Sequence, residues 1–74
     1  MSRLELQHES GGRRHYLNGE PVHAGEILEM YRDGKWITGR YEWTFREDEL
    51  PVFYVNEAGG YIIKSDDDLR WPTG

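Results

Sequence analysis

Short runs of strand-forming residues alternate with turn residues along most of this chain. The segment EMYRDGKWITG places Asp33-Gly34 between two such runs, which is typical of a β-hairpin with a two-residue turn. The runs VFYVN and YIIKS predict a second hairpin across residues 57–60, and Asn18-Gly19 predicts another tight turn. A short last strand is expected through Leu69 and Trp71. The pattern predicts an all-β fold of about five or six strands.

One segment also fits a helix. In HAGEILEMYR the apolar residues Ile27, Leu28 and Tyr31 recur at helical spacing. Gly25 and the Asp33-Gly34 turn leave too little room for a stable helix, so a strand is the favoured interpretation.

Residues 1–12 differ from the rest of the chain. They are mostly polar and end in ESGG, a composition that buries little apolar surface and predicts a flexible N-terminal tail. Leu4 and Leu6 alternate with charged residues, which leaves an edge strand as the alternative. The folded domain is expected to span residues 13–72.

Alternation along KWITGRYEW divides its side chains between two faces of a strand. One face is apolar and carries Ile37, Tyr41 and Trp43 with Gly39; the other carries Trp36, Thr38, Arg40 and Glu42. We expect the apolar face to lie in the core, together with Leu28 and Met30 from the preceding strand. Tyr31 and Trp36 then flank the Asp33-Gly34 turn on the outer face, with Arg40 beside Trp36.

The residues Tyr31, Trp36 and Arg40 are therefore the candidate partner-binding site. Tyr, Trp and Arg are the side chains that dominate the binding energy of protein interfaces. The alternative is structural, because a single Trp often covers the open end of the core in a small barrel.

Composition limits the classes of function. A chain of 74 residues forms one domain at most, and a domain near this size buries only about 60% of its unfolded surface, which leaves little room for a deep active site. The absence of cysteine excludes disulfides, thiolate metal sites and a cysteine nucleophile. No apolar run approaches the ~20 residues of a membrane helix, and the N-terminus lacks an apolar signal segment, so we expect a cytoplasmic protein.

No cofactor or metal site is predicted. His8, His15 and His23 lie in segments expected to be a tail, a strand and a turn, whereas a metal requires convergent ligands. His23 is instead expected to hydrogen-bond within the turn before Gly25. The run Asp66–Asp68 lacks the alternating ligands of a calcium loop and suits a capped or solvated turn after Ser65. No pair of carboxylates and no nucleophile motif stands out, so the protein is not expected to be an enzyme.

Part of the sequence resembles the middle of a Src-homology-3 domain. Gly25, Glu26, Ile27, Leu28 and Glu29 are followed by Trp36 and then by Gly39-Arg40. A second resemblance covers nearly all of residues 15–72: His23, Gly25, Glu26, Gly34, Trp36, Arg40 and Glu42 are similar in pattern to a family of small uncharacterised bacterial and phage proteins. These resemblances imply a five-stranded, antiparallel SH3-like barrel without an assigned activity.

The leading functional hypothesis is a non-catalytic module that binds a protein partner, acting as an inhibitor or adaptor of a host protein. The formal net charge is −5, and the acidic loops Glu47–Glu49 and Asp66–Asp68 favour a partner with a basic surface. The phage resemblance suggests one version, an inhibitor that occupies the nucleic-acid channel of a host enzyme. The alternatives are a nucleic-acid-binding barrel, which the acidic charge disfavours, and a small dimer formed through an open strand edge.

Overall fold

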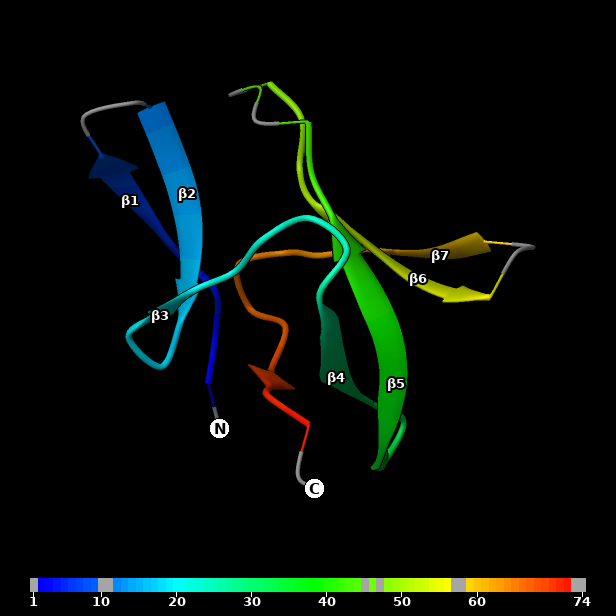
Figure 1. Cartoon of the computed structure of the whole chain (residues 1–74). Coiled ribbons are helices and arrows are strands. Elements are labelled where there is room, and N and C mark those ends of the chain that lie inside the picture. The colour runs from blue at the N-terminus through cyan, green and yellow to red at the C-terminus, as the bar shows by residue number, and fades with distance from the viewer. Residues whose placement is uncertain (1, 10–11, 45, 47, 57–58, 73–74) are drawn as a thin grey trace.

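The computed structural model describes residues 2–9, 12–44, 46, 48–56 and 59–72. Its strands are β1 (Glu5–Glu9), β2 (Gly12–Leu17), β3 (Glu20–Pro21), β4 (Ile27–Arg32), β5 (Lys35–Glu42), β6 (Val52–Asn56), β7 (Gly59–Ile62) and β8 (Leu69–Arg70). They form two antiparallel sheets with strand orders β1-β2-β3 and β7-β6-β5-β4-β8 (Figure 1). The described residues contain no helix, which confirms the all-β prediction. Accordingly, no helix in that part of the chain is long and apolar enough to cross a membrane.

The arrangement differs from a five-stranded closed barrel. In the described residues eight strands lie in two sheets, and these sheets do not close on each other (Figure 1). β8 is the short last strand that was expected through Leu69 and Trp71, and it covers Leu69–Arg70. β3 contains two residues, too few for the alternation of polar and apolar residues to predict it. The hairpin of β6 and β7 points away from the three-stranded sheet and leaves the five-stranded sheet open at that end (Figure 1).

The structure also differs from the sequence-based prediction in the N-terminal segment. Residues 5–9, which were expected in a flexible tail, form β1 and pair with β2, so that Leu6 lies opposite His15. The expected domain boundary at residue 13 falls within this hairpin. Leu4 packs against the core, and the Leu69 N–H donates to the Ser2 carbonyl at 2.7 Å. Cross-strand pairing thus orders a segment whose composition alone indicates disorder.

Two dipeptides set the tight turns as expected. Asp33 and Gly34 have φ values of 51° and 81°, and Asn18 and Gly19 have φ values of 53° and 80°. Two successive residues with positive φ make a type I′ turn, whose twist matches that of antiparallel strands. The turns join β4 to β5 and β2 to β3. The second predicted hairpin is also present, since β6 pairs with β7, although residues 57–58 lie outside the described part of the chain.

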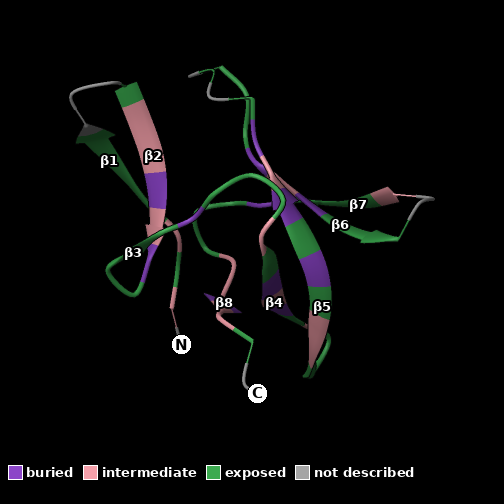
Figure 2. Cartoon of the chain, viewed as in Figure 1, coloured by how far each residue is buried: buried purple, intermediate pink, exposed green. Residues whose placement is uncertain are grey.

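The core lies between the two sheets. Its buried apolar members are Leu17, Val22, Leu28, Met30, Tyr41, Trp43, Phe53, Ile63 and Leu69. Buried and exposed residues alternate along the middle of β5 (Figure 2), so the parity that assigned Tyr41 and Trp43 to the core is confirmed. The Trp43 indole N–H donates to the Glu49 carbonyl at 2.7 Å, which satisfies the one polar group that its burial removes from water.

Candidate functional site: the outer face of the five-stranded sheet

The side of the five-stranded sheet that points away from the core is called the outer face here. Side chains that lie directly opposite one another on paired strands share a face. Ile27 lies opposite Arg40, and Arg40 lies opposite Tyr54. Tyr31 lies opposite Trp36 in the same register. The predicted site residues Tyr31, Trp36 and Arg40 therefore all occupy the outer face, as strand alternation indicates.

Tyr31 and Trp36 belong to an aromatic cluster near the Asp33-Gly34 turn. Their ring centroids are 5.3 Å apart with the planes at 64°. The guanidinium of Arg70, on β8, lies 4.1 Å from the centroid of the Trp36 ring. Arg70 also bonds to Glu29, with 2.5 Å between Nε and Oε1. These four residues, Glu29, Tyr31, Trp36 and Arg70, form what is called the aromatic cluster below.

Arg40 is not part of the aromatic cluster, contrary to the expectation that it lies beside Trp36. Four residues of an extended strand span about 13 Å, which separates the two side chains along β5. Arg40 instead pairs with Glu42, with 2.8 Å between Nε and Oε2, and lies 5.6 Å from the Tyr54 ring centroid. The cation over Trp36 comes from Arg70, which the antiparallel pairing of β8 with β4 brings beside it.

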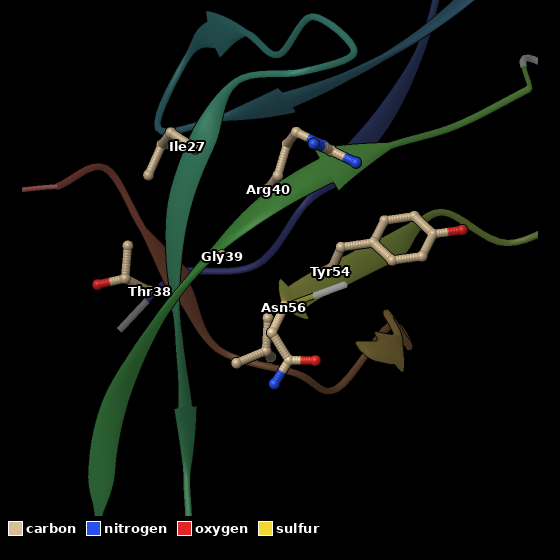
Figure 3. A pocket seen from close by; sticks show the side chains of 7 residues that line it. Ile27, Thr38, Gly39, Arg40, Tyr54 and Asn56 are labelled. Atoms are coloured by element: carbon tan, nitrogen blue, oxygen red, sulfur yellow. The ribbon is translucent and has the colours of Figure 1, made fainter. Parts of the chain in front are cut away.

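Arg40 lines a groove at the opposite end of the outer face. This fork groove has a volume of about 350 Å³ and is lined by Ile27, Thr38, Gly39, Arg40, Tyr54, Val55 and Asn56. The lining residues come from the neighbouring strands β4, β5 and β6 (Figure 3). Alternation along β4 places Ile27 on the outer face, because Leu28 and Met30 are buried. Alternation gives no indication that Tyr54 or Val55 lies beside it. Only the pairing of β6 with β5 places them there.

The fork groove forms where β6 diverges from β5, like the two prongs of a fork. The two strands pair along Arg40 to Glu42 only, and the ladder from β6 to β7 is irregular between Tyr54 and Asn56. At the point of divergence Gly39 allows the close approach. A Cβ built at Gly39 would lie 2.5 Å from the Phe53 ring and 2.8 Å from the Tyr54 carbonyl oxygen. A side chain at this position would separate the two strands and change the groove.

Four of the exposed large apolar residues, Ile27, Tyr31, Tyr54 and Ile62, lie on the outer face. Ile27 is 48% exposed and Tyr54 is 39% exposed. Ile62, on β7, lies opposite Val52 of β6 and is 55% exposed. Tyr31 in the aromatic cluster is 36% exposed, whereas Trp36 is half-buried. Trp36 does not cover the core: the half-buried apolar residues that pack against the core are Leu4, Ile37 and Trp71.

The acidic loops make hydrogen bonds and ion pairs with neighbouring residues. The Tyr31 N–H donates to the Asp68 carbonyl at 3.0 Å, so the turn after Ser65 lies next to the aromatic cluster. In that turn Asp67 accepts the Lys64 N–H at 2.8 Å. The capped turn expected after Ser65 is present, and Asp67 caps it. In the other loop Asp48 lies 3.7 Å from Arg46; Glu47 lies outside the described residues.

The histidines do not converge. No group of three or more histidine, aspartate or glutamate side chains in the described ranges is arranged to hold a metal. The His23 N–H donates to Glu26 Oε2 at 2.8 Å, as expected for a turn residue. His15 is buried, and the distance from its Nδ1 to the Tyr41 hydroxyl is 2.8 Å. Burial lowers the pKa of His15, which keeps the imidazole neutral near pH 7.

The outer face thus carries the aromatic cluster and the fork groove, while the buried His15 contacts Tyr41 and Trp43. Comparisons with known protein families, with characterised proteins and with solved structures find no match to this chain.

Proposed function

We propose that this protein is a non-catalytic module that binds a protein partner on the outer face of its five-stranded sheet. The observation that carries the proposal is the presence of Ile27, Tyr54 and Ile62 on that face with between 39% and 55% of each side chain exposed. Neighbouring exposed apolar side chains on a small protein mark interaction surfaces. The aromatic cluster extends the same face with the residue types that dominate interface energies.

The aromatic cluster is preorganised for binding. Arg70 stacks on Trp36 and is held by Glu29, so the indole has neighbours on the sheet before any partner arrives. A side chain that is already ordered loses less conformational entropy on binding than a free one. Tyr31 remains 36% exposed at the edge of the cluster and offers its ring to a partner. This supports the aromatic cluster as the anchor and the fork groove as the second contact.

The proposed partner has a basic surface. The chain carries a net charge of −5, and the acidic turn beside Tyr31 adds negative charge at one end of the outer face. Complementary charge accelerates association and favours partners of opposite sign. An inhibitor or adaptor of a cytoplasmic host protein fits this description. The proposal includes an SH3-like relationship, supported by the type I′ hairpin followed by Trp36 and Gly39-Arg40.

A non-catalytic role agrees with the position of the perturbed titratable groups. Burial lowers the pKa of His15 and raises that of Tyr41. Perturbed groups often mark active sites, but these two contact each other at 2.8 Å and lie away from the outer face.

The test begins with capture of the partner by immobilised protein, identification by mass spectrometry, and measurement of affinity with the purified partner. We expect Ile27→Ser and Tyr31→Ala each to weaken binding about tenfold, a loss of roughly 1.4 kcal/mol. Leu6→Ser is the matched control, because Leu6 is 48% exposed, as Ile27 is, but lies on β1.

Two results would overturn the proposal. One is equal affinity of the wild type, Ile27→Ser and Tyr31→Ala while circular dichroism shows each variant folded. The other is preferential binding to an oligonucleotide with an affinity that falls steeply between 50 and 200 mM salt, which is the behaviour of a nucleic-acid-binding protein.

A further inference from the structure

A crevice between the two sheets lies apart from the outer face. It has a volume of about 250 Å³ and is lined by Leu4, Leu6, His15, Leu50, Pro51, Ile63, Lys64 and Ser65. Five of these residues are apolar and three offer polar groups. A mainly apolar cavity with a few convergent polar groups is the usual form of a small-molecule site.

His15 is the best-ordered polar group in the crevice. The residue is only 8% exposed, and its ring contacts Trp43 at a centroid distance of 4.3 Å. Nδ1 is occupied by the Tyr41 hydroxyl at 2.8 Å. Nε2 is the other ring nitrogen, and His15 lines the crevice, so Nε2 is the ring atom offered to a ligand. Burial raises the pKa of Tyr41, which keeps its hydroxyl protonated and able to donate a hydrogen bond. The contact fits either imidazole tautomer. In the tautomer whose Nδ1 accepts from Tyr41, Nε2 carries the proton and is itself a donor.

Lys64 and Ser65 contribute the remaining polar groups. The Lys64 N–H is held by Asp67 Oδ2 at 2.8 Å, which sets the turn that carries both residues. The Lys64 side chain is exposed at the crevice and supplies a positive charge. The following run Asp66–Asp68 disfavours a dianion such as a phosphate more strongly than a monoanion, because the repulsion scales with charge. The charge pattern therefore favours a ligand with a single negative charge.

We propose that this crevice binds a small organic monocarboxylate whose apolar body lies among the leucines. The carboxylate accepts from His15 Nε2 and the Lys64 ammonium, while Leu4, Leu6 and Leu50 cover the apolar body. A cavity of about 150 Å³ accommodates benzene, so 250 Å³ suits a ligand of roughly ten non-hydrogen atoms by proportion. Octanoate has this size and is the probe for the test.

The experiment titrates sodium octanoate, below its micelle concentration, into the ¹⁵N-labelled full chain and follows the NMR spectrum. We expect shifts at Leu6, Ile63 and Lys64 and at the His15 ring nitrogens. Acetate, which lacks the apolar body, and 1-octanol, which lacks the charge, are the matched ligands. Octanoate should bind at least tenfold more tightly than acetate and about fivefold more tightly than octanol, the latter being the factor expected for one exposed ion pair.

Two variants separate the contributions. Lys64→Met should reduce the affinity for octanoate about fivefold, to that of octanol. Leu50→Ser should weaken octanoate and octanol alike, by about threefold or more. Ile62→Ser is the matched control, since Ile62 is 55% exposed and Leu50 is 59% exposed, but Ile62 lies on the outer face. It should leave octanoate binding unchanged.

The proposal is overturned if octanoate causes no shifts around the crevice, if acetate binds as tightly as octanoate, or if Ile62→Ser weakens octanoate as much as Leu50→Ser does. Failure here is distinct from failure of the proposed protein-binding function. That function depends on the outer face and is tested by Ile27 and Tyr31, neither of which lines the crevice.

Discussion

Acidification should destabilise the protein through His15. Its imidazole is buried against Tyr41 and Trp43, and burial lowers its pKa from the ordinary value of 6.5. The folded chain therefore resists protonation at His15, while the unfolded chain takes up that proton as the pH falls through 6.5. A proton that binds only the unfolded state favours unfolding. The His15 contribution to stability is fully present above pH 6.5 and is lost progressively below it, until the folded state is also protonated.

The size of this effect follows from proton linkage. Between the pKa values of the unfolded and folded states, one proton changes the free energy of unfolding by up to about 1.36 kcal/mol per pH unit. For a domain of this length, a change of that size in the free energy of unfolding shifts the melting temperature by roughly 5 to 10 °C. The informative window is pH 6.5 to 5.5, immediately below the ordinary pKa of histidine.

The assay is urea unfolding at several pH values, followed by tryptophan fluorescence, together with an NMR titration of the His15 ring. In the variant His15→Gln, the free energy of unfolding should no longer show the part of its pH dependence that arises from His15. Tyr41→Phe removes the hydroxyl but keeps the buried histidine, so it should keep the slope at a lower overall stability. If wild type and His15→Gln have the same slope between pH 6.5 and 5.5, or if the His15 ring titrates above 6.5 in the folded protein, the reasoning fails.

Three further predictions concern the hairpin, the groove and the aromatic cluster. Gly34→Ala should cost about 1 kcal/mol in urea unfolding, because φ at this position is 81°; an unchanged midpoint would contradict the type I′ turn. Gly39→Ala should cost about 1 to 3 kcal/mol, because its Cβ meets the Phe53 ring at 2.5 Å; a neutral effect would mean that the strands separate freely. A double-mutant cycle of Arg70→Met with Trp36→Leu should give a coupling energy of about 0.5 to 1 kcal/mol for the stacked pair, and additive effects would refute that interaction.

The sequence predicted the parts of the fold that depend on residues close together in the chain. Asp33-Gly34 specifies a turn with two positive φ values because few other residue pairs tolerate them. Alternation in β5 assigned Tyr41 and Trp43 to the core because successive side chains of a strand point to opposite sides. The same rule placed Tyr31 and Trp36 together across the turn. These statements need only local geometry, so one sequence was sufficient for them.

The composition of the candidate site was decided by pairing between distant segments. Alternation put Arg40 and Trp36 on one face, but it carries no information on which strand lies beside β4. β8 occupies that place, so Arg70 stacks on Trp36, while Arg40 reaches Tyr54. The order of residues 5–9 has the same origin, since β1 is stable only against β2. An isolated strand has little stability, because its burial and hydrogen bonds come from a neighbouring strand. The local sequence does not indicate which strand that neighbour is.

The all-β class, the two tight turns and the inward sides of β4 and β5 follow from the sequence alone. Only the tertiary structure decided that the sheets stay open, that β6 separates from β5 to form the fork groove, and that His15 faces both the core and a crevice. The division has one physical cause. Turns and alternation arise from backbone sterics within a few residues, whereas grooves and buried polar contacts arise where strands far apart in the chain meet.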